Sequence, residues 1–361
     1  MSLGRDPLDG RYRQLSRTVD GTKREAQRAL AALITEVSAG RETGANATVA
    51  DLLAQWLDLA AEQLSPTTLR TYQQIVRTRL GPAIGSVRVR KLRAQQLDQL
   101  YGALMRDGKL SPTTVRQVHS VIRRALAQAV RWGWVPVNVA ANATPPRARK
   151  PHLDPPRMAD VQKILAAAFE ENTEFGVFLH VVAASGARRG EACALRWADI
   201  DLETGIVIIS RSIINTPSGG YLEKDTKTHA IRKLALDVDT IALLDAHHRR
   251  MTARATACGT TLPQEAFVFS ESADAMRPWH PDTPTARFVR LRHNVGLDNV
   301  RLHDLRHMHA TQLLAAGVPV RTVSGRLGHA NAATTLNVYA HFLEASDRQA
   351  ATVMGDLLRP T

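Results

Sequence analysis

Two nearly identical segments constrain the middle of the chain to a helical fold. Residues 65–70 (SPTTLR) and 111–116 (SPTTVR) each begin with a serine that is followed by a proline. Serine is a favoured N-cap residue and proline is favoured at the first helical position, so each segment predicts the start of a helix. Apolar residues follow both starts at helical spacing. Two copies are too few for a solenoid, and we interpret them as two helices that use the same cap.

The flanking sequence predicts how this helical region begins and ends. Upstream, Thr22 and Glu25 have the spacing of a capping box, which predicts a helix over residues 26–37 after a short strand near residues 12–19. Helical spacing then continues from residue 48 to residue 142. The segment PPRARKP at residues 145–151 predicts a linker, because proline blocks helices and the charges repel one another.

The last part of the chain contains a β-rich stretch. Residues 206–213 are β-branched and alternate, residues 217–220 (PSGG) predict a turn, and residues 231–236 are largely apolar, which together predict a small antiparallel sheet. The predicted fold is therefore mainly α with a small antiparallel β-sheet. The predicted domains are residues 1–45, residues 48–145 and residues 152–361.

The charge of the 361-residue chain favours an anionic polymer as its partner. The net charge is +13 and the pI is about 10.4, which favours DNA or RNA over the alternative of a basic but ordinary protein. Basic residues crowd the helices of the middle region with few acids to offset them, which favours a phosphate-contacting surface over a solvated face. The predicted DNA-binding residues are Arg70, Arg77, Arg116, Arg123 and Arg124.

Several functions are disfavoured by the sequence. Cys193 and Cys258 lie far apart and match no zinc spacing, which favours a reduced, intracellular setting. No apolar run approaches the roughly 20 residues that cross a bilayer, and the N-terminus shows no basic segment followed by an apolar one, as a secretory signal would. We therefore expect a cytoplasmic protein with no membrane partner.

The last part of the chain also carries residues suited to phosphate chemistry. Ser185 and Gly186 predict a helix start with Ser185 near the N-cap, which would place Arg188 in the first turns and Glu191 three residues later on the same face. Such a pair is either a surface salt bridge of little energy or a guanidinium held so that it meets two phosphate oxygens.

Two further segments contribute titratable side chains. His303 and Arg306 are predicted to share a helix face, and His307 follows, but no carboxylate or cysteine completes a metal site, so we predict no metal. Lys227 is predicted near the turn of a hairpin. A lysine at this position either contributes to solubility or donates a proton to a leaving oxygen. The second role requires a pKa below the reference value of about 10.4.

Tyr339 follows His329 by ten residues. Gly328 predicts the end of a helix over residues 318–327, which puts His329 on a connection before a helix that begins near residue 332. Ten residues of one straight helix would span about 15 Å, too far for one phosphate, so the break lets His329 and Tyr339 converge. Tyr339 is otherwise interpreted as a core aromatic. Because the arginines and histidines described above precede it along the chain, the functional interpretation is that Tyr339 attacks a phosphodiester that they hold.

The motifs SGARRGE at residues 185–191, LHDLRH at 302–307, and LGH at 327–329 followed by YAH at 339–341 resemble those of the tyrosine recombinase family, specifically phage-type integrases of bacteria. The resemblance covers nearly the whole chain. It implies a shortened arm-site-binding module, a helical SAM-like core-binding domain, and a catalytic domain of the DNA breaking-rejoining type. The implied function is site-specific recombination through a 3′-phosphotyrosyl intermediate, for integration and excision of a phage genome or mobile element.

The resemblance also implies a role for each site residue. Tyr339 corresponds to the nucleophile, Arg188 and Arg306 to the pair that grips the non-bridging oxygens, Lys227 to the residue that protonates the 5′-hydroxyl, His303 to the residue that assists proton transfer at the tyrosine, His329 to a phosphate hydrogen-bond donor, and Glu191 to a supporting acid. Lys224 remains an alternative to Lys227, because the hairpin register is not visible in the sequence. No cofactor is implied, since the phosphotyrosine conserves the bond energy for rejoining, and the sequence has no Walker motif and no carboxylate cluster for two metals.

The implied partners are double-stranded DNA attachment sites, DNA-bending and directionality factors, and a homotetramer whose amphipathic C-terminal tail docks on a neighbouring protomer. One alternative is a DNA-binding protein that has lost catalysis, against which the intact motifs argue. Another keeps the chemistry but uses it for chromosome-dimer resolution or transposon movement. An arm module favours the integrase, because bivalent binding would bridge separate sites.

Overall fold

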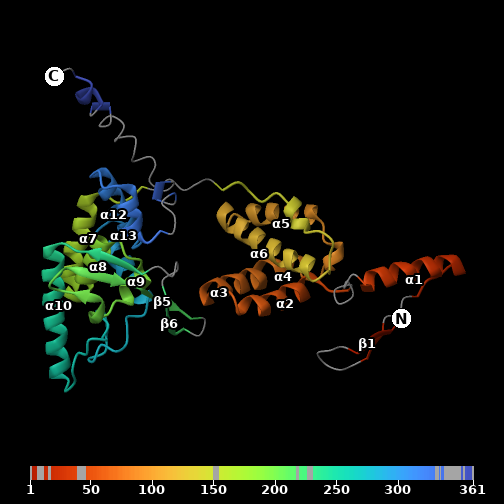
Figure 1. The fold of residues 1–361 in the computed structure, drawn as a ribbon, viewed down its shortest axis with the longest axis horizontal. Helices are drawn as coiled ribbons and strands as arrows, with labels where there is room; N and C mark the ends of the chain where they lie inside the picture. The colour runs from red at the N-terminus through yellow and green to blue at the C-terminus, as the bar shows by residue number, and fades with distance from the viewer. Residues whose placement is uncertain are drawn as a thin grey trace. The chain divides into compact units, whose positions relative to one another are not determined.

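The computed structural model describes residues 2–5, 12–14, 18–38, 46–148, 154–216, 219–225, 231–329, 333, 335–336, 351–352 and 354–359. The chain divides into two compact units, Met1–Lys150 and Pro151–Thr361 (Figure 1). Lys227 and Tyr339 lie outside the described residues.

The first unit begins with a strand pair and a helix. Strands β1 (Ser2–Arg5) and β2 (Tyr12–Gln14) pair antiparallel. Helix α1 (Lys23–Ser38) begins at Lys23 rather than at residue 26, because the backbone N–H of Thr22 donates to the Glu25 carboxylate at 2.7 Å. The pairing of Thr22 with Glu25 is therefore confirmed. Of the strand predicted near residues 12–19, residues 12–14 form β2, and residues 18 and 19 lie outside any strand.

The middle of the first unit is helical throughout, as predicted. Its elements are α2 (Val49–Ala61), α3 (Pro66–Ile75), the π-helical turn η1 (Val76–Leu80), α4 (Gly81–Ile84), the 3-10 turn η2 (Val89–Lys91), α5 (Ala94–Arg106), α6 (Pro112–Arg131) and the 3-10 turn η3 (Val139–Asn142). The Ser65 hydroxyl accepts a hydrogen bond from the Thr68 N–H at 3.4 Å, and the Ser111 hydroxyl accepts one from the Thr114 N–H at 3.2 Å. Both predicted N-caps are confirmed.

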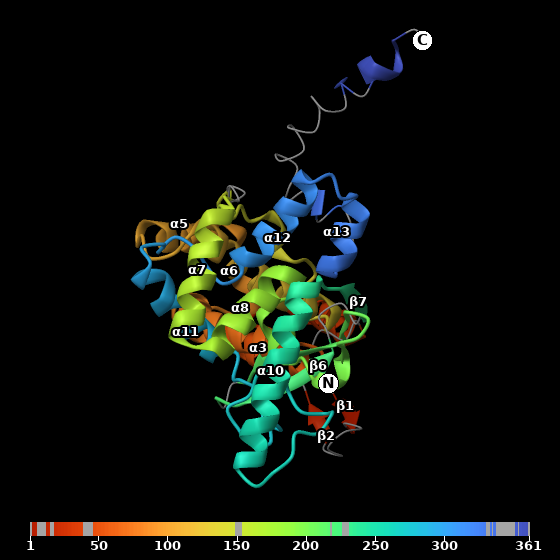
Figure 2. The same ribbon diagram turned by 90° about the vertical axis from the view of Figure 1, so that its left-hand side faces the viewer.

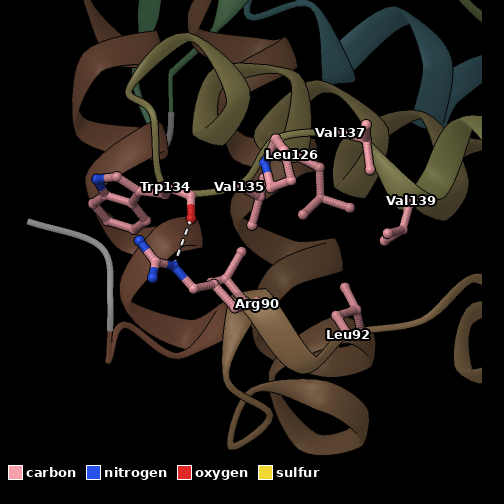
Figure 3. Close-up of a pocket in the computed structure, with 9 residues that line it drawn as sticks. Arg90, Leu92, Leu126, Trp134, Val135, Val137 and Val139 are labelled. Atoms are coloured by element: carbon pink, nitrogen blue, oxygen red, sulfur yellow. Dashed lines mark hydrogen bonds between the residues drawn. The ribbon is translucent and has the colours of Figure 1, made fainter. Parts of the chain in front are cut away.

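Helix α6 is the centre of this helical core, since α2, α3 and α5 all contact it. Its residues Val115, Val118 and Ile122 are fully buried, as the apolar spacing predicts. Beside α6, apolar side chains near η2 and in the turn that follows α6 line a hollow, where the Arg90 Nε donates to the Trp134 carbonyl at 3.0 Å (Figure 3).

The second unit is built around one buried helix. Its helical elements are α7 (Met158–Glu171), α8 (Thr173–Ser185), α9 (Arg189–Cys193), the 3-10 turn η4 (Trp197–Asp199), α10 (Val238–Ala257), α11 (Asp282–Asn294), α12 (Asp304–Ala315) and α13 (Val320–Leu327). Helix α8 contacts α7, α10 and α12, and it lies between α7 and α10 in Figure 2. Because it is apolar on all sides, it buries Phe175, Phe178 and Val182 against these neighbours.

The predicted single sheet is wrong in its connectivity, because the second unit contains two small antiparallel sheets. Strands β3 (Ile200–Asp201), β4 (Ile206–Ile209) and β7 (Arg232–Ala235) form one, and β5 (Arg211–Asn215) and β6 (Tyr221–Asp225) form the other. The β-branched run is divided after Ile209, where Arg211 donates to the Asp199 carboxylate at 2.7 Å and the chain changes partner. None of the described helices is both long and apolar enough to cross a bilayer.

Candidate active site

The segment that carries Arg188 begins its helix later than the sequence predicts. Ser185 is the last residue of α8 and not an N-cap, because its hydroxyl donates back to the Val181 carbonyl at 2.5 Å. Gly186 then takes the left-handed conformation that ends many helices, with φ of +65°. Arg188 is itself the N-cap of α9, so it lies before the helix and not in its first turns.

Glu191 is the centre of a buried ion-pair network. Its Oε2 accepts a hydrogen bond from the backbone N–H of Arg188 at 2.8 Å, and its Oε1 accepts one from Nη1 of Arg188 at 2.8 Å. The same carboxylate accepts Nη1 of Arg232 at 3.2 Å and Nη2 of Arg232 at 2.6 Å. Glu191 is 2% exposed and Arg232 is 7% exposed, so this pairing is shielded from water, whereas the side chain of Arg188 is 28% exposed.

The charge of Glu191 is stabilised in this position. Burial raises the pKa of the carboxyl group, but the hydrogen bonds and charge of Arg232, followed by those of Arg188, outweigh burial and leave the pKa below its usual value. Glu191 is therefore ionised at neutral pH. The Arg188 and Glu191 pair had two interpretations from the sequence. Burial of the Glu191 carboxylate excludes the first one, a weak salt bridge at the surface.

Arg306 joins the ends of two helices. It lies in the first turn of α12 and is 3% exposed. Its Nη1 donates to the Gly186 carbonyl at 2.6 Å, and its Nη2 donates to the Leu327 carbonyl at 2.5 Å. These carbonyls close α8 and α13, where a cation is favoured by both hydrogen bonding and the helix dipole.

The turn that carries His329 has the predicted geometry. Helix α13 ends at Leu327, and Gly328 follows with φ of +63°. The Gly328 carbonyl accepts Arg188 Nη2 at 3.5 Å, which brings this turn to the arginine. His329 Nδ1 lies 2.8 Å from the hydroxyl of Thr335, a helical residue with no exposed surface.

His303 and His329 are both neutral at physiological pH. Burial, followed by the positive charges of Arg306 and Arg188, lowers the pKa of His329 to about 4. Partial burial, followed by the charges of His307 and Arg306, lowers the pKa of His303 to about 4, although this residue is exposed to solvent. His303 is the N-cap residue of α12, and its ring meets that of His307 edge-on with centroids 4.9 Å apart.

The structure thus brings together Arg188, Glu191, Arg306 and His329, with His303 beside them. The positions of Lys227 and Tyr339 are not among the described residues. Lys224 lies in β6 opposite Ser212 of β5, within the ladder of the two-stranded sheet. Among the residues that the structure describes, no group of three or more His, Cys, Asp or Glu side chains is arranged to hold a metal ion.

Sequence reasoning missed Arg232 and Thr335. A signal for Arg232 is present, since it shares the inward face of β7 with Leu234 two residues later, and a cation at an inward position requires a partner. Thr335 has no comparable signal, because only the fold places its hydroxyl beside His329.

The five predicted DNA-binding arginines are all exposed, and all lie in the first unit. Two of them have partners there. Arg116 Nη1 donates to the Pro146 carbonyl at 3.3 Å, and Arg124 donates to the Tyr72 hydroxyl and lies with its guanidinium 5.7 Å from that ring.

Comparison with known sequences identifies the class of protein. The sequence pattern of the phage integrase family matches residues 157–345, more than half of the chain, and that of the phage integrase N-terminal SAM-like domain matches residues 48–105. The chain belongs to the phage integrase family and is a tyrosine-type site-specific recombinase acting on DNA. The first unit therefore contains a SAM-like core-binding domain, and the second is the integrase catalytic domain.

Individual relatives have low sequence identity, but their alignments cover most of the chain. The ICEBs1 integrase of Bacillus subtilis is 23% identical and aligns with 99% of this chain and 96% of its own length. An integrase of Saccharopolyspora erythraea is 24% identical over 81% of this chain and 79% of its own. Tyrosine recombinase XerC of Xanthomonas campestris is 27% identical over 82% of this chain and 86% of its own.

Solved structures share the fold. A Tn1549 transposon integrase in complex with circular intermediate DNA superposes with a TM-score of 0.71 at 17% identity, covering 84% of this chain and 99% of its own. A lambda integrase tetramer bound to a Holliday junction superposes with a TM-score of 0.58 at 17% identity, covering 92% of this chain and 90% of its own.

Proposed function

We propose that this recombinase cleaves its attachment sites with Tyr339 and forms a 3′-phosphotyrosyl intermediate, in integration and excision of a phage or mobile element. The observation that carries the proposal is the meeting of Arg188, Arg306 and His329 at the ends of α8, α12 and α13. Two guanidinium groups beside a neutral imidazole suit a phosphodiester, whose transition state carries extra negative charge.

The titration of the site supports a division of labour. A phenol has a pKa of about 10 and attacks as its phenolate, so a base must receive its proton. The lowered pKa of His303, about 4, leaves it neutral at pH 7, so a ring nitrogen can accept a hydrogen bond from the phenol and assist its proton transfer, although the low pKa makes His303 a weak base. His329 is neutral for the same reason, and when the Thr335 hydroxyl donates to Nδ1, the Nε2 carries a proton that can be donated to the phosphate.

The leaving oxygen requires a proton of its own, because an alkoxide leaves poorly. We assign this proton to Lys227 rather than to Lys224. Lys224 lies within the ladder of β5 and β6, next to Glu223, which binds Arg196 at 2.8 Å. We expect Lys227→Ala to slow cleavage strongly and Lys224→Ala to leave it within about threefold of wild type. A duplex with sulfur at the 5′-bridging position restores cleavage by Lys227→Ala, since a thiolate leaves without protonation.

The central experiment traps the covalent intermediate. A nicked duplex that carries the attachment site, read from the sequences that flank this gene's insertion point, is incubated with the full chain and analysed under denaturing conditions. We expect a protein–DNA adduct with wild type and none with Tyr339→Phe. An adduct that persists in Tyr339→Phe refutes the nucleophile assignment. Loss of the adduct in both proteins, with DNA binding retained, favours a DNA-binding protein without catalysis.

We also propose how the enzyme assembles. It acts on double-stranded DNA in the cytoplasm of a bacterial host, as a homotetramer with DNA-bending and directionality factors, and residues 1–45 serve as a shortened arm-site-binding module. The C-terminal tail docks on a neighbouring protomer, which is supported by its exposed apolar side chains Met354, Leu357 and Leu358. Truncation before Ala345 is expected to reduce assembly and recombination more than DNA binding. Equal loss of binding would argue against docking.

A further inference from the structure

Arg232 is a buried cation to which the roles above give no function. It begins β7, where the alternation of the strand points it inward together with Leu234. Both terminal nitrogens of its guanidinium donate to the carboxylate of Glu191, at 3.2 and 2.6 Å. The side chain is 7% exposed, and the charge of its guanidinium is paired with that carboxylate.

We propose that Arg232 is a positioning residue for strand cleavage, which acts by holding Glu191 so that the guanidinium of Arg188 keeps both its orientation and its net positive charge. This inference rests on the proposed role of Arg188 at the scissile phosphate. It adds a residue that does not contact DNA itself but determines how well Arg188 binds the scissile phosphate.

The first step of the argument is electrostatic. Glu191 alone would neutralise Arg188, because the two charges lie 2.8 Å apart and the carboxylate is buried. Arg232 adds a second positive charge beside the same carboxylate, at 2.6 Å. The trio then carries a net charge of +1, since two guanidinium groups share one carboxylate. An anion that approaches Arg188 therefore meets a positive site and not a neutral pair.

The second step concerns orientation. The Glu191 carboxylate accepts four hydrogen bonds, two from Arg188 and two from Arg232. Arg232 holds both carboxylate oxygens in a bidentate pair, which fixes the orientation of the carboxylate. The same two oxygens accept hydrogen bonds from Nη1 and the backbone N–H of Arg188 and so fix that residue in turn. Removal of Arg232 leaves a buried carboxylate that is free to rotate toward Arg188 and pull it away from solvent.

The third step extends this support to His329. A Cβ atom added to Gly328 would lie 3.0 Å from Nη1 of Arg232, so the turn before His329 rests directly on the Arg232 guanidinium. The Gly328 carbonyl also accepts Nη2 of Arg188 at 3.5 Å. Arg232 thus lies behind both Arg188 and the turn that carries His329.

The experiment uses the full chain, with Arg232→Met as the main variant because it removes the charge and keeps the length. Arg232→Lys is the conservative variant. Arg326→Met is the matched control, since Arg326 also reaches β7 and α8 but, among the described residues, donates to the carbonyls of Ala235 and Ala184 and to no carboxylate. Each protein is measured for its thermal midpoint, for attachment-site binding, and for the rate of adduct formation on the nicked duplex at saturating protein.

We expect Arg232→Met to slow adduct formation by about 100-fold while attachment-site affinity stays within about threefold, the scale of a lost electrostatic stabiliser. Arg232→Lys recovers part of the rate, and Arg326→Met stays within about threefold of wild type. In a Glu191→Gln background, the further effect of Arg232→Met falls below about threefold, because no carboxylate remains to be neutralised. If Arg232→Met does not fold, Arg232→Lys and the Glu191→Gln pair supply the same comparison.

A modified substrate separates positioning from general damage. When a methyl group replaces a non-bridging oxygen, the scissile phosphate is neutral and depends less on Arg188. The defect of Arg232→Met should then shrink to below about tenfold. The inference is overturned if Arg232→Met slows adduct formation equally on both substrates, or if its rate matches that of Arg326→Met. It is also overturned if a 5′-bridging sulfur restores the rate of Arg232→Met, because the defect would then lie in protonation of the leaving oxygen. Failure of wild type to form a Tyr339-dependent adduct refutes the proposed function itself, which keeps the two failures distinct.

Discussion

A buried histidine in the catalytic domain should make its stability fall in a defined pH window. His247 lies in α10 with 2% of its surface exposed, and its Nε2 donates to the Val268 carbonyl at 2.8 Å. Its ring stacks on Phe269 with centroids 5.6 Å apart. Burial, opposed in part by the hydrogen bond to Val268, lowers the pKa of His247 to about 4.

The magnitude follows from proton linkage. The unfolded chain has a histidine pKa of about 6.5, so at pH 5.5 it is about 90% protonated at this position, whereas folded His247 is almost entirely neutral. Because the folded pKa is the lower one, stability is fully present above pH 6.5 and is lost as the pH falls toward 4. Between pH 8 and pH 5.5 the loss from His247 alone is about 1.4 kcal/mol.

The assay is urea unfolding of the full chain at pH 8.0 and pH 5.5, comparing wild type with His247→Phe. The variant loses a buried hydrogen bond and is less stable at both pH values, but its loss between them should be smaller by about 1.4 kcal/mol. Phe269→Leu is the control, since it weakens the same packing without a titratable group and should shift both values equally. It also identifies the transition that belongs to the catalytic domain. If His247→Phe keeps the full pH dependence of wild type, the reasoning is wrong.

Three further perturbations test the site and the DNA surface. Gly328→Ala should reduce stability by about 1–2 kcal/mol in a thermal melt, because φ is +63° and the new Cβ would press on Arg232 at 3.0 Å. Thr335→Val should slow adduct formation by roughly tenfold, as it removes the hydroxyl that orients His329, and Thr335→Ser should restore the rate. Arg123→Gln should lower the slope of binding against salt by about 1 while the cleavage rate at saturating DNA stays unchanged, because Arg123 is exposed in the core-binding domain. An unchanged salt slope would remove Arg123 from the DNA surface.

Local signals predicted the helices of the core-binding domain well. Ser65 and Ser111 cap their helices as expected, and Val115 and Val118 are buried as their spacing predicts. Each of these features depends on residues within two turns of one another, which is the range over which sequence patterns are informative. Gly328 belongs to the same group, since a glycine after an apolar periodic segment is a strong end signal for a helix.

Features that depend on contacts between distant segments of the chain were predicted less well. Ser185 was interpreted as an N-cap, but the same residue also suits the last turn of a helix when a glycine follows, and only the packing of α8 decides between them. The β-branched run at residues 206–213 predicts one strand, but the structure divides it between β4 and β5, because pairing is set by contacts such as those between β4 and β7 across intervening chain.

The candidate active site combines both kinds of information, which is why its residues stand out in the sequence while the contacts that support them do not. Arg188, Arg306 and His329 stand in short motifs, so the sequence alone brings them to attention. Their convergence depends instead on carbonyls at helix ends, as when Arg306 binds those of Gly186 and Leu327. Residues that act only through such contacts have no motif of their own. Arg232 is of this kind, and its hydrogen bonds to the buried carboxylate of Glu191 connect it to the proposed chemistry.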